Sequence, residues 1–301
     1  HRLLGNAAYL VRVDGNVTTY DWTLKGKPTP PRYQWTTTGL NFVGFPTPPS
    51  SPPDFETFLA GAAELQRVAE IFQYPGGALG PGNPVRVFAL RTTAVKRGEA
   101  FWIRSPGVFN RYFGPIEFHL QNSDGAHFGD QLSRYRITLR NLQPAPVTVT
   151  LRLLTSEAPP AGQTAIVQLP PLLVRGSLNT TTLQYSHTNL GDGPQSWTLA
   201  AQGLVGSEVE VVLGLNRSLM SASADSLYAG VLRLTDSLNL SQIDLPVSAT
   251  VASTSGLWVG EATVSQVRHY LKTFARDGAG KPITVPSPAD NPTTAPYQVT
   301  A

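Results

Sequence analysis

The clearest pattern of apolar and polar positions lies in residues 227–251. Apolar residues recur at alternate positions in two runs, and a polar segment rich in Asp, Ser and Asn separates the runs at 235–239. A period of two over this length predicts two half-buried antiparallel strands joined by a turn. The apolar positions are Tyr228, Leu232 and Leu234 in the first run, and Ile243, Leu245, Val247, Ala249 and Val251 in the second.

Similar short runs with turn signals between them continue through residues 114–254. Regularly spaced short strands are typical of a sandwich rather than of a parallel α/β sheet, so this region predicts an antiparallel Ig-like β-sandwich. The alternation assigns these side chains to its core: Tyr135, Ile137, Val149, Leu151, Val211, Leu232, Leu245 and Val247.

Residues 1–113 predict a β-rich domain with one helix at about 54–69. Asp54 is placed to cap that helix, and apolar residues follow it at helical spacing. The whole chain is therefore expected to be mainly β, with the two β-domains in tandem. Further strands are predicted at 9–13, 40–45, 71–74, 85–90 and 98–104, and in the sandwich at 166–169.

Residues 255–301 predict the start of a further β-module, or an exchanging strand, followed by a Pro-rich tail. Trp258, Gly260, Ala262 and Val264 share one face of that strand, which makes it a template for pairing with another chain. Both ends of the sequence suggest a piece of a longer protein.

Composition narrows the function classes. Charged residues make up 14% of the chain, the net charge is +3, and the Arg residues are scattered, so nucleic acid is not an expected partner. We find no apolar run of about 18 residues, and hence predict no membrane span. Because the chain has no Cys, it has no disulfides and no thiolate metal site.

Two short motifs carry a resemblance to a known group of proteins. Asn41–Pro46 reads NFVGFP, and Arg97–Ile103 reads RGEAFWI. Together they resemble a module of large, modular, secreted bacterial surface proteins, where it stands beside Ig-like repeats. GLWVGEATV at 256–264 is similar to sequences that open a further β-domain in such proteins. The resemblance implies a secreted or cell-surface location, and the family has no catalytic residues to carry over.

Candidate chemistry is sparse. Asn122, Asp124 and Asp130 predict either a Ca²⁺ loop of oxygen ligands or an Asx turn that needs the same residues. No other cofactor is expected. The histidines lack zinc-site spacing, no G-x-S-x-G motif occurs, and the carboxylates are dispersed, so no enzymatic activity is predicted.

Aromatic residues suggest one binding role. Trp22, Tyr33 and Trp35 flank a Pro-rich loop and are candidates for carbohydrate contact if they lie at the surface. Trp102 and Trp258 lie within apolar strands, so we expect them in the core.

The leading hypothesis is a non-enzymatic structural or adhesive module of a larger secreted or cell-surface bacterial protein, for example a subunit of an extracellular fibre. Its expected partners are other copies of itself or other surface proteins. The alternatives are a carbohydrate-binding module that contacts glycans, and accessory domains of a polysaccharide-degrading enzyme.

Overall fold

The computed structural model describes residues 3–13, 21–32, 35–36, 39–105, 112–252 and 279. These residues contain fourteen strands and four short helical segments, so the predicted mainly β fold is confirmed. Residues 1–256 form one compact unit, which holds two clusters of buried apolar side chains. The division into domains at residue 113 stays a prediction.

The N-terminal cluster packs under a four-stranded antiparallel sheet. Its order is β1-β4-β2-β3, and its strands are β1 (Asn41–Gly44), β4 (Ala100–Arg104), β2 (Glu70–Gln73) and β3 (Val85–Arg86). Val43, Phe101 and Ile103 face the core, whereas Trp102 is only half-buried and stacks on Phe42 with ring centroids 4.2 Å apart. Trp102 therefore lies on the opposite face of the sheet from the core.

The predicted helix forms as three successive segments, α1 (Phe55–Phe58), η1 (Leu59–Ala62) and α2 (Ala63–Val68). Asp54 caps α1 as expected, because its carboxylate accepts from the Thr57 N–H at 2.8 Å. The interruption coincides with Gly61, a weak helix former whose Cα lies against Gln143 of the sandwich. A side chain at position 61 would collide with Gln143, so the close packing requires a glycine there. The low helix propensity of that glycine then favours the interruption of the helix.

Two predicted strands are wrong. Tyr9–Val13 alternates in sequence but adopts no regular structure and is largely exposed. Residues 166–169 contribute a single bridge, from Ile166 to Leu227. Alternation creates a strand only where a partner offers hydrogen bonds, and neither segment has a ladder of them.

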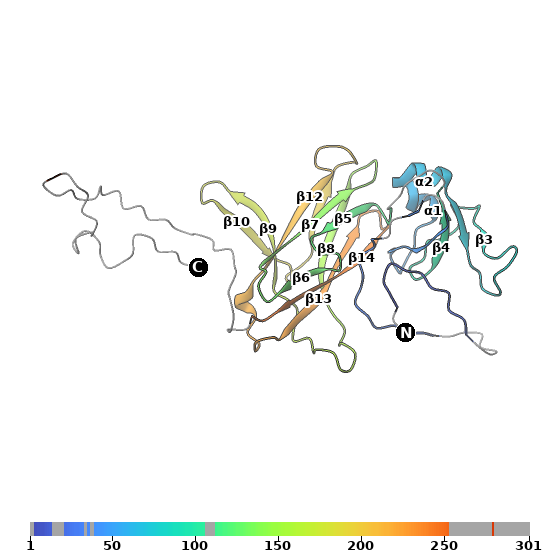
Figure 1. Cartoon of the computed structure of the whole chain (residues 1–301). Helices are drawn as coiled ribbons and strands as arrows, with labels where there is room; N and C mark the ends of the chain where they lie inside the picture. The colour runs from blue at the N-terminus through green and yellow to red at the C-terminus, as the bar shows by residue number, and fades with distance from the viewer. Residues whose placement is uncertain are drawn as a thin grey trace. The chain divides into compact units, whose positions relative to one another are not determined.

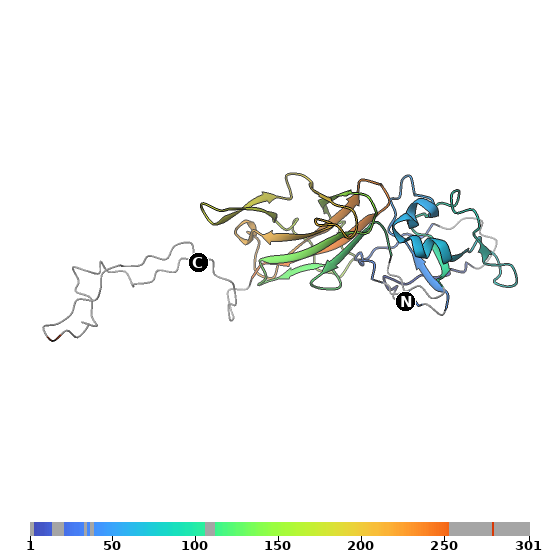
Figure 2. The same ribbon diagram turned by 90° about the horizontal axis from the view of Figure 1, so that it is seen from above.

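The C-terminal cluster lies between two five-stranded sheets, whose layers are visible in Figure 2. Sheet I has the order β10-β9-β12-β7-β5, and sheet II the order β11-β8-β13-β14-β6. Sheet I consists of β5 (Ile116–Leu120), β7 (Arg134–Asn141), β9 (Leu172–Asn179), β10 (Gln184–Asn189) and β12 (Glu208–Leu215). Sheet II consists of β6 (Ala126–Gly129), β8 (Val147–Thr155), β11 (Gln195–Leu199), β13 (Leu227–Asp236) and β14 (Gln242–Thr250).

The alternation predicted the core of this sandwich correctly. All eight side chains assigned to it are buried, and β13 alternates half-buried and buried residues along its whole length. In Figure 1 the orange strands β13 and β14 lie side by side, in the antiparallel register that pairs Leu232 with Leu245. The predicted antiparallel sandwich is thus confirmed, while the closer likeness to Ig domains stays a prediction.

One connection departs from the antiparallel pattern. After β5 the chain crosses from sheet I to sheet II, where β6 pairs with β14 in parallel. The buried Tyr135 hydroxyl holds this crossing, because it accepts from the Asn122 N–H and donates to the Gly125 carbonyl, each at 2.9 Å. Gly125 has a φ of +141°, and a Cβ there would lie 2.5 Å from the Pro246 carbonyl oxygen, so no other residue fits without rearrangement.

Truncating a core side chain should destabilise the sandwich. We expect Leu245→Ala to lower the free energy of unfolding by about 2–5 kcal/mol, because Leu245 is 0% exposed and its removal leaves a cavity. The matched control is Leu204→Ala, at a side chain that is 62% exposed, where the change should stay within about 0.5 kcal/mol. Urea unfolding measures both, and equal midpoints for the two variants would contradict the core assignment.

Candidate functional site

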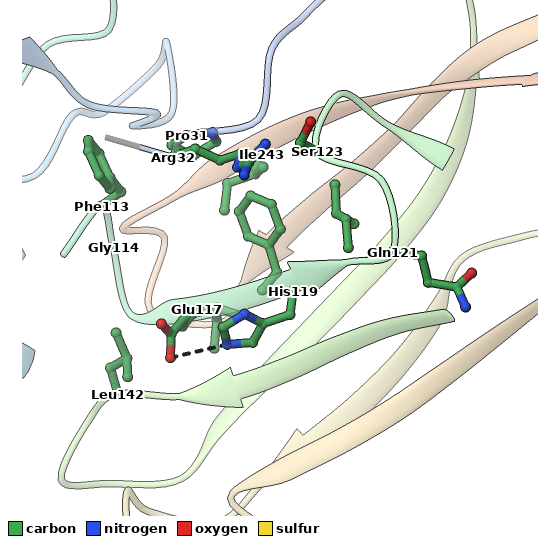
Figure 3. Close-up of a pocket in the computed structure, with 13 residues that line it drawn as sticks. Pro31, Arg32, Phe113, Gly114, Glu117, His119, Gln121, Ser123, Leu142 and Ile243 are labelled. Carbon is green, nitrogen blue, oxygen red and sulfur yellow. Dashed lines mark ion pairs between the residues drawn. The ribbon is translucent and has the colours of Figure 1, made fainter. Parts of the chain in front are cut away.

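A groove of about 400 Å³ runs beside β5, at one edge of the sandwich. Its walls come from four parts of the chain: Pro31 and Arg32 before the N-terminal sheet, Phe113 before β5, Ser123 after β5, and Ile243 on β14. Figure 3 shows Pro31, Arg32 and Ile243 on one side of β5, and Glu117 and His119 on the other. The groove therefore follows the strand's outer edge.

The backbone of β5 offers unpaired hydrogen-bonding groups to this groove. The Leu142 N–H donates to the Pro115 carbonyl, just before β5 begins. Because residues of an antiparallel strand direct their N–H and C=O groups alternately to the two sides, Glu117 and His119 also direct theirs towards β7. Ile116, Phe118 and Leu120 consequently direct their N–H and C=O groups away from β7. Among the described residues no strand pairs with that side, because β5 is the end strand of sheet I.

The side chains give the groove an apolar floor and a polar rim. Ile116 is buried in the sandwich core, and Phe118 and Leu120 are half-buried against it. On the opposite face of β5, Glu117 lies 3.6 Å from His119 and 3.4 Å from Arg140. An extended ligand would thus meet apolar side chains on one face and charged groups on the other.

The facing edge of β14 is also partly uncovered. β6 pairs only with Val247–Ala249, in the second half of β14. At the first residue, the Gln242 N–H donates to the Pro46 carbonyl at 2.7 Å, and its carbonyl accepts from Arg97 at 2.8 Å. The uncovered stretch of β14 therefore lies between Gln242, which is held by Pro46 and Arg97, and Val247, where the pairing with β6 begins. Ile243 belongs to this stretch.

A second polar cluster lies where β6 meets β14, under the strap, which we define as residues 21–32. Lys27 Nζ lies 2.7 Å from His127 Nε2 and 3.4 Å from the Asp124 carboxylate, and His127 Nδ1 lies 2.7 Å from Ser248 Oγ. Burial, followed by the nearby Lys27 ammonium, lowers the pKa of His127 below its ordinary value of 6.5.

This cluster contains a Ser, a His and an Asp, yet its hydrogen bonds run in the wrong direction for nucleophile activation. The Lys27 ammonium has no lone pair, so Nε2 of His127 must accept from it. The ring proton then sits on Nδ1 and is donated to Ser248 Oγ. A catalytic serine needs the reverse arrangement, in which the histidine accepts the hydroxyl proton. The cluster instead attaches the strap to sheet II.

The residues of the predicted Ca²⁺ loop have separate roles in this structure. Asn122 contributes its N–H to the Tyr135 hydroxyl, Asp124 faces Lys27 and His127, and Asp130 acts on Arg217 through its charge. Asn122 and Asp124 belong to the crossing between the sheets, and the Asx-turn alternative stays a prediction. Within the described residues, no three His, Asp or Glu side chains gather as metal ligands. Ca²⁺ binding at the loop stays a prediction.

The three aromatic candidates do not form one surface. Trp22 is 49% exposed, as the prediction requires. Trp35 is only 1% exposed and packs between Phe45 and Phe113, so its predicted surface position is wrong. The Pro-rich flanks suggested a loop, but the large ring is apolar enough to enter the core from one. Tyr33 and Trp258 lie outside the described residues.

Sequence reasoning missed the groove itself. Nothing in the residues of β5 marks it as an end strand with an open side. That property depends on which strands pair, and sequence alternation is silent about pairing.

Comparisons with known proteins leave the assignment open. Neither a known protein family nor a curated protein matches the sequence. Among solved structures, the adhesin CfaE mutant of enterotoxigenic E. coli covers 62% of this chain and 73% of its own, with 10% identity and a TM-score of 0.27. The CupB6 tip adhesin of Pseudomonas aeruginosa covers 60% and 56%, with 14% identity and a TM-score of 0.23. The human CEP192 PapD-like domain covers 47% and 87%, with 10% identity and a TM-score of 0.26. Likeness at these TM-scores carries no argument about function.

The described part of the chain contains no helix with the length and apolarity needed to span a membrane.

The burial of His127 and its contact with Lys27 should make the free energy of unfolding depend on pH. Because the pKa of His127 is lowered in the folded state, the unfolded state binds more protons just below pH 6.5. The free energy of unfolding should therefore fall as the pH drops through 6.5, and His127→Gln should remove that part of the slope.

Urea unfolding between about pH 5 and pH 8 measures this dependence. His187→Gln, at an exposed histidine of β10, is the matched control and should retain the slope. An identical slope in His127→Gln and wild type would contradict the assignment.

Proposed function

We propose that this chain is a non-enzymatic structural and adhesive module of a larger secreted or cell-surface protein, and that it associates with its partners through strand pairing. The observation that carries the proposal is the groove beside β5, where three residues direct unpaired backbone groups outward. An open strand edge is a template for another strand, and proteins that do not use such an edge normally cover or charge it.

The composition of this edge supports a binding role. Edges that are protected against association carry prolines, bulges or inward-pointing charges. The inward positions of β5 are instead Ile116, Phe118 and Leu120, which contribute to the core. An added strand would extend both the hydrogen-bonded ladder and the apolar layer, as in β-strand addition.

The extracellular location rests on the sequence resemblance of residues 41–46 and 97–103 to modules of secreted bacterial proteins. The first motif contains β1 and the second contains most of β4, and these two strands pair in one sheet. A module of this kind serves as a spacer, an adhesin stalk or a fibre subunit, and each of these functions needs contacts between neighbours rather than chemistry.

A carbohydrate-binding function has less support. Only Trp22 of its three candidates is exposed among the described residues, and one ring does not make a stacking platform. The stacked pair Phe42 and Trp102 is half-buried, with nearly parallel rings that cover one face of each other.

Association of the chain tests the proposal. Light scattering over a concentration series should show species heavier than the monomer, and deletion of Gly256–Ala301 should return a monomer because it removes the predicted pairing strand. Circular dichroism checks that the deletion variant retains its strands, as expected from the compactness of residues 1–256.

A monomer at every concentration, with and without the deletion, would contradict association through this segment. A glycan array with the full chain and Trp22→Ala is the parallel test of the carbohydrate alternative. Glycan binding that Trp22→Ala abolishes, in a chain that stays monomeric, would favour that alternative.

A further inference from the structure

We propose that the groove beside β5 is an acceptor site for a β-strand, and that the strand is Leu257–Val267 of a second copy of this chain. The inference rests on the proposed function, because it names the partner of the same groove. It assigns the acceptor residues, which neither the sequence pattern nor any resemblance identifies.

The backbone of β5 is the first reason. Ile116, Phe118 and Leu120 present three N–H and three C=O groups at regular spacing along the groove. One strand laid beside them satisfies these groups in register, as a strand inside a sheet would. A single side chain or a helix cannot satisfy all of these groups, because its donors and acceptors do not repeat at the spacing of a strand.

The side-chain pattern of the segment is the second reason. A strand in the groove alternates between the apolar floor, formed by Phe118, Leu120 and Ile243, and the solvent. The segment alternates in the same way. We assign Trp258, Gly260, Ala262 and Val264 to the floor; the intervening set holds the polar Glu261, Thr263 and Ser265 in its centre and Leu257, Val259 and Val267 towards its ends.

Size also agrees. A groove of about 400 Å³ has room for a few small side chains beside one large one. Gly260, Ala262 and Val264 are small, and Trp258 is the one large side chain of that set. A strand with bulky residues at each inward position would not fit without displacing the floor.

The course of the chain favours a second copy over the chain's own segment. Ile243 lines the groove near the start of β14, whereas the chain leaves the sandwich after Thr250, roughly 23 Å further along. Leu257 follows Ala252 after only a short linker that spans at most about 17 Å. A chain filling its own groove must reverse along β14, and this constraint does not apply to the segment of a second copy. The resulting contact is head-to-tail, and repetition of it makes a filament.

The opposite edge of sheet I is a weaker acceptor. Every residue of β10 is exposed, so a strand added there gains hydrogen bonds but buries no core side chain. The groove beside β5 provides both, which is why we assign the acceptor to β5.

Amide exchange gives the most direct test. The full chain, ¹⁵N-labelled and dilute, is titrated with a synthetic peptide of residues 256–267. Amides of Ile116, Phe118 and Leu120 should exchange quickly without peptide and become protected with it. Amides of Glu117 and His119, which face β7, serve as internal controls and should be protected throughout. A peptide carrying Ala262→Pro is the matched ligand control and should bind more weakly.

Variants of the full chain test the groove. Ser123→Trp places a bulky ring at an exposed groove residue and should weaken peptide binding by about tenfold or more, with loss of association. Ser221→Trp, at an exposed serine outside the groove, should bind like wild type. Leu120→Pro is the second variant. It removes an outward N–H while leaving the bonds to β7 intact, so it remains informative if Ser123→Trp fails to fold.

Three results would overturn the inference. The first is unchanged peptide binding and association in both Ser123→Trp and Leu120→Pro. The second is association of the wild type without protection of the three outward amides, which would leave the proposed function standing with another contact surface. The third is protection of those amides in a monomeric full chain without peptide, which would mean that the chain's own segment occupies the groove.

Discussion

The edge geometry of this protein depends on the hydrogen bonds of one buried hydroxyl. Tyr135 holds the turn that takes the chain from sheet I to sheet II, and Gly125 lets that turn pass against Pro246. Without the crossing, β5 and β6 would run on as one strand in one sheet. With it, each sheet receives only a short end strand, and β6 covers only the second half of β14. The groove is the space that this division leaves beside β5.

A separate set of hydrogen bonds, at the start of β14 and around Tyr112, connects the sandwich to the N-terminal sheet. Asp244 accepts from Arg233 at 2.7 and 3.0 Å and from Arg97 at 3.3 Å, while Arg97 also donates to the Gln242 carbonyl. Nearby, the Tyr112 hydroxyl donates to the Phe58 carbonyl at 2.6 Å and accepts from Gln143, and burial raises the pKa of Tyr112. The buried Tyr112 hydroxyl, which is hydrogen-bonded on both sides, helps to rigidify this joint. The groove is accordingly lined from both clusters: Ile116 and Ile243 belong to the sandwich core, and Phe113 and Leu142 pack against the N-terminal core.

Alternation was sufficient to predict the sandwich core, because burial of one sheet face imposes the same period on the sequence. It identified Leu232 and Leu245, and also Tyr135 as a buried ring, but not what the Tyr135 hydroxyl bonds. The prediction failed where burial depended on distant partners. Trp35 enters a core formed by residues far along the chain, and Tyr9–Val13 alternates without a strand to pair with. The open edge of β5 was invisible for the same reason, since an edge is defined by a missing neighbour.

The parallel pairing of β6 with β14 has a mechanical consequence. β6 follows β5, the first strand of the sandwich, and the chain leaves the sandwich after β14, so tension that reaches β6 through the crossing and β14 through its C-terminal end would pull the two strands in opposite senses. The hydrogen bonds between them would then be loaded together in shear, rather than broken one after another as in a peeled hairpin. The contact of His127 with Ser248 lies in this patch, and Arg217 bridges its end by donating to the Gly129, Leu132 and Thr250 carbonyls. A domain built in this way should resist stretching along β6 and β14 more strongly than peeling of the same strands.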